Sequence, residues 1–89
     1  MTITFNAAFD WQVSSRLTNS QRIQVLDVLE LFVVEPFHRD LRNHELKGVW
    51  TGFRSISVGG DLRLHYQPFG MDTAVFVAVG THKQLYREL

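Results

Sequence analysis

The stretch that decides the fold is FRSISVGGDLRLHYQ, residues 53–67. Two runs of alternating apolar and polar residues flank Gly59 and Gly60, and a Gly-Gly pair between such runs favours a two-residue hairpin turn. With the turn on these glycines, Arg54 faces His65 across the hairpin, and side chains alternate between its two faces. The predicted apolar face carries Phe53, Leu62, Leu64 and Tyr66, and the predicted polar face carries Arg54, Asp61, Arg63 and His65.

The period of the apolar residues predicts the elements on either side of this hairpin. After it, residues 68–72 form a turn, and the continuously apolar run 74–79 is typical of a strand in the middle of a sheet with both faces covered. A short helix over 83–89 follows. Before it lies a charged connection, residues 37–48, in which no steady period is visible.

Helical spacing dominates the N-terminal part of the chain. A short strand that includes Ile3 and Phe5 comes first, and apolar residues four apart then predict a helix over residues 9–17. Residues 18–20 supply N-cap candidates for a second helix over 21–34, which Pro36 ends. The order is strand, two helices and three antiparallel strands, which predicts an α+β fold with helices packed on one sheet face.

Length and composition favour one small soluble domain over residues 1–89. The chain is 45% apolar and has no cysteine, so neither a disordered chain nor a disulfide scaffold is expected. The longest apolar run has six residues, 74–79, whereas a membrane span needs about 20. No basic segment followed by an apolar one opens the chain, and we expect a cytoplasmic protein without membrane contact.

The charges are unevenly distributed although the formal net charge is zero. Two basic and four acidic residues lie up to Pro36, and seven basic and five acidic residues follow it together with all four histidines. A basic, histidine-rich half is able to hold a phosphate group. The alternative is a solvated surface of mixed charge.

The polar face of the hairpin suggests a chemistry. An arginine guanidinium matches phosphate oxygens, and a histidine transfers protons near neutral pH without a metal. The alternative is an ordinary solvated sheet face. The histidine spacings fit no compact metal site, and no glycine-rich phosphate loop or nucleophile elbow is present, so we expect neither a metal nor a cofactor.

Four motifs resemble the RelE/ParE toxin superfamily. They are LRNHELKG at 41–48 with Trp50, GFR at 52–54, GDLRLHY at 60–66 and VGTHKQLY at 79–86. The YafQ-type branch of RelE-like mRNA interferases is the most similar, and the resemblance extends over most of the chain. It implies the RelE-like fold for the α+β domain.

The resemblance implies the toxin of a type II toxin–antitoxin system. Such toxins enter the ribosomal A site and cut mRNA, without a metal, through attack of a 2′-hydroxyl on the next phosphate. The chain would therefore be an endoribonuclease that inhibits translation. The residues at matching catalytic positions are His44, Asp61, Arg63, His82 and Tyr86, and those expected to contact RNA are Lys47, Arg54, His65 and Lys83.

Three positions depart from the pattern of these relatives. Ser57 replaces a histidine of the YafQ branch, Leu62 replaces a tryptophan, and Ile56 lies where RelE has a lysine. The expected partners are an antitoxin encoded beside the toxin and the mRNA on the ribosome, with DNA reached only through the antitoxin complex. Two alternatives remain, a ParE-like toxin that inhibits a DNA topoisomerase without chemistry of its own and an inactive relative that binds antitoxins.

Overall fold

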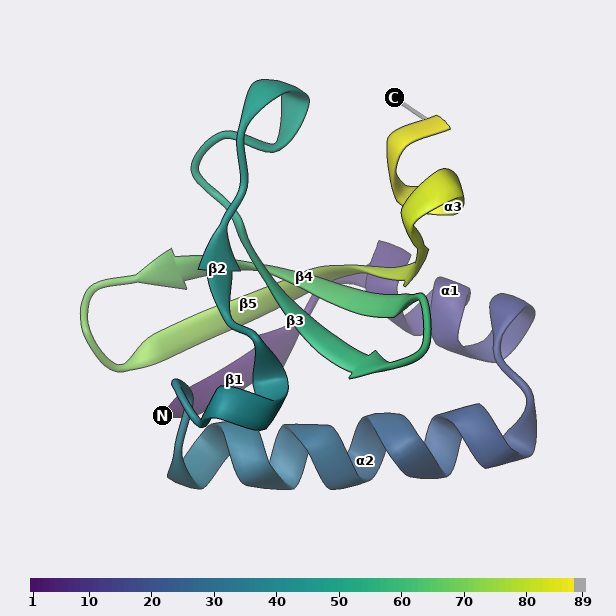
Figure 1. The fold of residues 1–89 in the computed structure, drawn as a ribbon, viewed down its shortest axis with the longest axis horizontal. Coiled ribbons are helices and arrows are strands. Elements are labelled where there is room, and N and C mark those ends of the chain that lie inside the picture. The colour runs from purple at the N-terminus through teal and green to yellow at the C-terminus, as the bar shows by residue number, and fades with distance from the viewer. Residues whose placement is uncertain (88–89) are drawn as a thin grey trace.

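The computed structural model describes residues 1–87. Within them the strands form a five-stranded sheet in the order β1-β5-β4-β3-β2 (Figure 1), with β1 parallel to β5 and the other neighbours antiparallel. The elements in chain order are β1 (Thr2–Phe5), α1 (Ala7–Arg16), α2 (Asn19–Val34), the 3-10 turn η1 (Arg39–Leu41), β2 (His44–Glu45), the 3-10 turn η2 (Gly48–Trp50), β3 (Arg54–Gly59), β4 (Leu62–Phe69), β5 (Thr73–Thr81) and α3 (His82–Arg87).

An aromatic cluster joins the long helix α2 to the sheet. Phe32 of α2 lies edge-on to Tyr66 and Phe76, with ring centroids 5.0 and 5.2 Å apart, and Phe9 of α1 lies 5.9 Å from Phe76. All four side chains are buried, and such ring pairs stabilise a core beyond their buried area. The predicted α+β fold is confirmed, with α1 and α2 in one core and α3 over the other face of the sheet (Figure 1).

Both long helices begin at side chains that accept backbone N–H groups. Asn6 Oδ1 accepts from the N–H of Phe9 at 2.8 Å. At the start of α2, Thr18 Oγ1 accepts from the N–H of Gln21 at 3.1 Å, and Gln21 Oε1 accepts from the N–H of Thr18 at 2.9 Å. This reciprocal pair is a capping box, and it explains why the break predicted at residues 18–20 starts a helix.

Helix α1 completes the edge of β5 where β1 stops. Strand β1 pairs with β5 only as far as Phe76. Beyond that point, Gln12 Oε1 accepts from the N–H of Val79 and Arg16 donates to the carbonyl of Val79, both at 2.9 Å. These polar groups of β5 are therefore satisfied without another strand.

Two segments differ from their predictions. The turn predicted at 68–72 is shorter, because β4 continues through Pro68, which pairs with Ala74 of β5. Pairing with β3 ends at Tyr66, so the missing N–H of Pro68 removes no ladder bond. The connection 37–48 contains η1 and the two-residue strand β2, which the sequence did not predict.

The last helix begins at His82, one residue before its predicted start. Its predicted final residues, 88–89, lie outside the described residues. No helix within residues 1–87 is long and apolar enough to cross a membrane.

Candidate functional site

Three strands present a row of side chains to the sheet face opposite α2. His44 of β2 pairs with Ser55 of β3, which pairs with His65 of β4. Ser57 and Arg63 form the next pair. Paired residues of antiparallel strands point to the same face, so these five residues share one surface, which we call the histidine face.

The turn of the hairpin lies one residue later than predicted. It is formed by Gly60 and Asp61 rather than by Gly59 and Gly60, and β3 contains an extra residue between Ser57 and Gly59. Gly60 has a φ of 53°, in the left-handed region that glycine adopts without steric cost. A β-bulge of this kind shifts the register of every pair beyond it. The predicted pairing of the two strands is therefore wrong by one residue.

Arg54 lies on the opposite face from the one predicted. It pairs with Tyr66, and its guanidinium donates to Asn43 Oδ1 at 2.8 Å and lies 3.5 Å from the Glu45 carboxylate. The same guanidinium lies over the Phe37 ring, 5.3 Å from its centroid. Arg54 therefore does not lie beside His65 but attaches the connection before β3 to the edge of the sheet, and its contact with RNA stays a prediction.

His65 is buried at the centre of the histidine face, with 1% of its surface exposed. Its ring is edge-on to Trp50, with centroids 4.5 Å apart, and edge-on to Tyr86 at 6.1 Å. The neighbouring Ser55 is also buried and leaves room for these rings. The expectation that His65 contacts RNA is corrected, because its ring lies beneath Trp50 and α3.

The surroundings of His65 keep it neutral. Burial, followed by the positive charges of His44, His82 and Arg63, lowers the pKa of His65 to about 4. Burial has this effect because it penalises the charged form of an imidazole, and like charges add to the penalty. The three groups named act on His65 from β2, α3 and β4, so the histidine face and the start of α3 form one electrostatic site.

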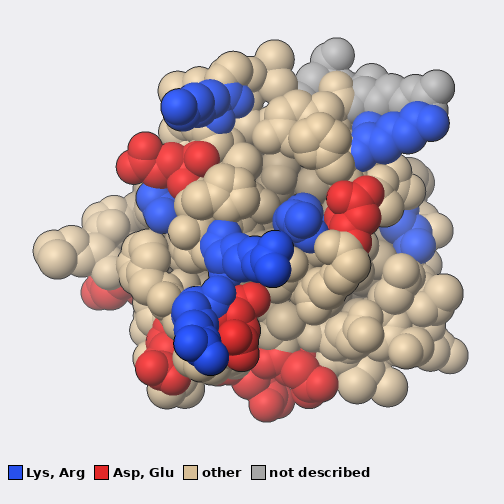
Figure 2. All heavy atoms as spheres, in the orientation of Figure 1, with Lys and Arg blue, Asp and Glu red and all other residues tan. Residues whose placement is uncertain are grey.

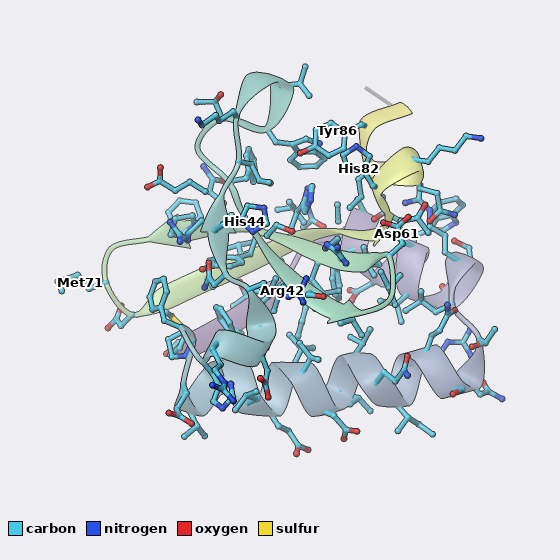
Figure 3. The ribbon with its side chains drawn as sticks, in the orientation of Figure 1. Arg42, His44, Asp61, Met71, His82 and Tyr86 are labelled. Atoms are coloured by element: carbon cyan, nitrogen blue, oxygen red, sulfur yellow. The ribbon has the colours of Figure 1, made fainter. Side chains whose placement is uncertain are left out.

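Helix α3 brings two of the predicted catalytic residues to this site (Figure 3). His82 and Tyr86, one turn apart, stack with ring centroids 4.6 Å apart. Trp50 donates its indole N–H to the carbonyl of Leu85 at 3.2 Å, which joins the β2–β3 connection to the helix. The short helix is thus fixed from below by buried Leu85 and from the side by Trp50.

A backbone carbonyl fixes the ring of His44. His44 Nδ1 donates to the carbonyl oxygen of Arg42 at 2.8 Å. Arg42 has a φ of 50°, and among the described residues it is the one residue other than glycine with a positive φ. Such a conformation is uncommon for an arginine and often occurs at functional positions. Arg42 was missed in the sequence, because no local pattern marks a left-handed arginine.

Arg63 and Asp61 lie at the hairpin end of the site. The Arg63 guanidinium donates to the carbonyl of Gly60 at 2.9 Å and of Leu62 at 3.2 Å, and lies 3.4 Å from Ser57 Oγ. Asp61 is exposed in the turn, on the side of the site where His82 begins α3 (Figure 3). His44 lies on the other side of the site, opposite Asp61 and His82 (Figure 3).

The two lysines predicted to contact RNA are exposed on segments that border the histidine face. Lys47 precedes η2 in the β2–β3 connection, and Lys83 lies in α3. Figure 2 shows basic side chains across this side of the molecule with acidic ones between them. Among the described side chains, no group of three or more His, Cys, Asp or Glu residues is arranged to hold a metal ion.

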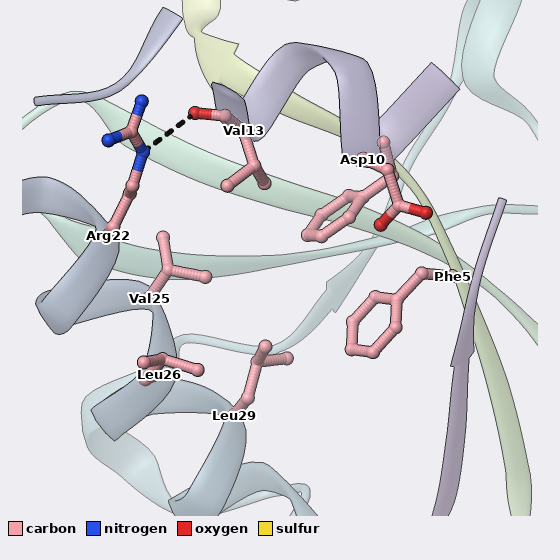
Figure 4. Close-up of a pocket in the computed structure, with 8 residues that line it drawn as sticks. Phe5, Asp10, Val13, Arg22, Val25, Leu26 and Leu29 are labelled. Carbon is pink, nitrogen blue, oxygen red and sulfur yellow. Dashed lines mark hydrogen bonds between the residues drawn. The ribbon is translucent and has the colours of Figure 1, made fainter. Parts of the chain in front are cut away.

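An apolar groove of about 300 Å³ lies away from this site, between β1, α1 and α2 (Figure 4). Asp10 and Arg22 lie beside it. Its apolar lining consists of Phe5, Phe9, Val13, Val25, Leu26 and Leu29. Of these, Leu26 is 60% exposed and Phe5 41% exposed.

Comparison with known proteins gives one family and a set of similar folds. The family described as the bacterial toxin of type II toxin–antitoxin systems, YafQ, matches residues 1–87. YafQ from Escherichia coli strain BL21(DE3) superposes with a TM-score of 0.76 at 20% identity, over 94% of this chain and 96% of that one. A search of curated proteins found no similar sequence.

Two further solved structures have the same fold. A YoeB/ParE toxin from Agrobacterium tumefaciens has a TM-score of 0.72 at 18% identity, over 92% of this chain and 99% of that one. YafQ in the Escherichia coli DinJ–YafQ complex has a TM-score of 0.68 at 23% identity, over 94% of this chain and 96% of that one.

Proposed function

Because the chain belongs to the YafQ family of toxins from bacterial type II toxin–antitoxin systems, we propose that it is an endoribonuclease that cleaves mRNA on the ribosome and inhibits translation. The observation that carries this proposal is that groups suited to proton transfer and charge stabilisation meet on the histidine face. His44 comes from β2, Arg63 from β4, and His82 and Tyr86 from α3. Such a protein acts where ribosomes are, in the cytoplasm.

The proposed reaction needs two proton transfers and one cation. The 2′-oxygen of a nucleotide attacks the phosphorus of the next phosphodiester while a base removes its proton. The bond from phosphorus to the 5′-oxygen breaks, and an acid protonates that leaving oxygen. The products are a 2′,3′-cyclic phosphate and a 5′-hydroxyl, and a cation stabilises the negative charge that develops on the phosphorane oxygens.

His44 is the proposed base. The carbonyl of Arg42 can only accept a hydrogen bond, so His44 Nδ1 carries the proton. In the neutral ring, Nε2 then holds the lone pair that accepts a proton. The left-handed backbone at Arg42 aims the carbonyl that selects this tautomer.

His82 is the proposed acid, on the opposite side of the site. It is exposed at the first position of α3, and the Tyr86 ring stacks on it. Asp61 lies on the same side of the site (Figure 3). Partly exposed Tyr86 also presents ring surface on which a nucleobase can stack.

Arg63 is the proposed cation for the developing phosphate charge. One of its terminal nitrogens donates to the turn carbonyls of Gly60 and Leu62. These bonds hold the guanidinium over the histidine face beside Ser57, where its remaining N–H groups can meet phosphate oxygens. Lys47 and Lys83 are proposed contacts to the RNA backbone on either side.

We further propose that a cognate antitoxin covers the apolar surface of α2. The DinJ–YafQ complex shows that a related toxin binds such a partner. Here Ile23, Leu26 and Val34 of α2 are 61, 60 and 77% exposed, and Leu26 also lines the apolar groove. Covering exposed apolar groups of this kind drives protein association.

The test is to induce the gene in a bacterium and map mRNA 5′ ends with and without ongoing translation. We expect growth arrest and new 5′-hydroxyl ends within coding regions, which a translation inhibitor abolishes. A double variant His44→Ala, His82→Ala should arrest neither growth nor translation. His38→Ala, a histidine outside the histidine face, is the matched control and should cleave like the wild type.

Two outcomes would contradict the proposal. Arrest with intact mRNA and damaged DNA would identify a topoisomerase inhibitor. Normal growth of cells that accumulate folded, antitoxin-binding protein would identify an inactive relative.

A further inference from the structure

The buried histidine of the site has no part in the proton transfers proposed above. His65 is neutral near pH 7 and is 1% exposed, so it neither donates a proton there nor touches substrate. Its Nδ1 is buried without a hydrogen-bond partner among the described residues. A buried polar atom without a partner lowers stability, so stability alone does not account for a histidine here.

The contacts of His65 lead to the two functional groups of α3. Its ring meets Trp50 at 4.5 Å and Tyr86 at 6.1 Å, both edge-on. Tyr86 stacks on His82 at 4.6 Å, and Trp50 holds the carbonyl of Leu85. The ring of His65 thus contacts both Trp50, which is hydrogen-bonded to α3, and Tyr86, which belongs to α3.

We propose that His65 is a positioning residue, whose ring on β4 sets through Trp50 and Tyr86 where α3 places His82 over the sheet. This inference rests on the proposed function and names a residue that acts through another. The described part of α3 has six residues, and so short a helix is not stable by itself, because helix nucleation is unfavourable. Its position therefore depends on the side chains beneath it.

The charges around His65 explain why a neutral ring suits this place. His44 faces it from β2, His82 from α3 and Arg63 from β4. A permanent cation at this position would repel the neighbouring Arg63 guanidinium. A neutral aromatic ring supports α3 without that repulsion.

The experiment compares His65→Phe, which keeps a neutral ring, with His65→Leu, which removes it. His38→Leu is the matched control, the same chemical change on a residue outside the histidine face. Single-turnover cleavage on programmed ribosomes gives the maximal rate and the concentration for half-maximal rate. NMR titration of the His82 ring, and thermal unfolding, are measured on the same proteins.

We expect His65→Leu to remain folded and to lower the maximal cleavage rate up to about 100-fold, because small displacements of a catalytic group have effects of this size. The half-maximal concentration should change little, and the His82 ring signals and pKa should shift. His65→Phe should recover most of the rate and both NMR values. His38→Leu should match the wild type in cleavage and in the His82 signals.

Three results would overturn the inference. The first is that His65→Leu cleaves at the wild-type rate and leaves the His82 signals unchanged. The second is that His65→Phe is folded but cleaves as slowly as His65→Leu, which would assign the role to a ring nitrogen. The third is a rate loss that tracks unfolding alone.

The NMR readout separates this inference from the proposed function. If the wild type does not cleave mRNA, the nuclease proposal fails, while a shifted His82 in His65→Leu still supports the positioning role. If the wild type cleaves and His82 is unmoved in His65→Leu, only the positioning role fails.

Discussion

At the scale of single residues, the neutral imidazole of His65 makes stability depend on pH. Its pKa is about 4 in the folded protein against an ordinary value of 6.5, so between these values the unfolded chain binds more protons. Stability therefore falls as pH decreases from 6.5 to 4, by an amount on the order of 3 kcal/mol. We expect His65→Leu to lack this part of the decline.

Urea unfolding at several pH values between 7.5 and 4 measures the effect. The difference in unfolding free energy between wild type and His65→Leu should grow in favour of the variant as pH falls. His38→Leu serves as the control for loss of a histidine outside the histidine face. Parallel pH curves for wild type and His65→Leu would show that His65 does not titrate this way.

The backbone of Arg42 leads to a second prediction at this scale. Arg42→Gly and Arg42→Val both remove the cation, but glycine adopts a φ of 50° freely and valine resists it. We expect Arg42→Gly to be the more stable variant, by about 1 kcal/mol or more. Arg42→Val should cleave about tenfold more slowly than Arg42→Gly, because valine displaces the carbonyl that holds His44 Nδ1. A tenfold change in rate corresponds to about 1.4 kcal/mol of activation free energy.

Cleavage rates across pH 5.5 to 8.5, a range set around the ordinary histidine pKa, test this expectation. The acidic limb of the profile, where a general base loses activity through protonation, reports the role proposed for His44 and should change shape in Arg42→Val only. Equal rates and equal profiles for the two variants would remove the backbone of Arg42 from the mechanism.

At the scale of elements, Gly80 permits the close approach of α3 to the end of β5. A Cβ atom there would lie 2.9 Å from Gln84 Oε1 and 3.0 Å from the Arg16 guanidinium. Gln84 is held in place, because its Oε1 accepts from the N–H of Thr81 and its own N–H donates to Thr81 Oγ1. We expect Gly80→Ala to break this cap, at about 0.5–2 kcal/mol.

The same substitution should slow cleavage, since His82 lies between the two capping residues. Thermal unfolding and single-turnover cleavage are the measurements. Gly80→Ala combined with Gln84→Ala removes the contact with Gln84 Oε1, so Gly80→Ala should cost less stability in the Gln84→Ala background than in the wild type. A Gly80→Ala protein with wild-type stability and rate would show that the helix tolerates the displacement.

Elements with many periodic residues were predicted from the sequence, and those defined by pairing were not. Apolar spacing located α1 and α2, and alternation located β3 and β4. Strand β2 has two residues inside a charged connection, so only its partner β3 defines it. The hairpin register was missed by one residue because the turn can be placed on either side of Gly60, and the bulge that decides between them has no sequence signal.

Residue types and their environments were accessible from the sequence to different degrees. His44, Arg63 and His82, which the resemblance implied as site residues, each act electrostatically on His65 in the structure. Alternation placed His65 correctly on the polar face but gave no sign of its burial, which depends on Trp50 and on α3 folding over that face. Long-range packing of this kind is absent from a local pattern.

At the scale of the whole molecule, zero net charge means that the proposed RNA binding has to rely on local groups. Lys47 and Lys83 border the histidine face, and each phosphate contact adds about 0.7 to 1 to the slope of log affinity against log salt concentration. We expect Lys47→Ala and Lys83→Ala each to weaken binding to programmed ribosomes and to reduce that slope by this amount.

Gln24→Glu is the matched control, because it changes the net charge equally on exposed α2, beneath the other face of the sheet. Its slope should equal that of the wild type. A slope that changes equally in all three variants would mean that overall charge, rather than contact, governs the association.

The parallel pairing of β1 with β5 also affects the order in which the fold is completed during synthesis. Ile3 pairs with Ala74, so the first strand to be synthesised has no partner until one of the last strands has been made. His44 and Arg63 emerge before β5 and α3, and Leu85 must be present before Trp50 has its acceptor. A nascent chain therefore carries the first of the proposed catalytic groups without the helix that completes the site. Under the proposed function, its own message is translated before that chain can cleave any message.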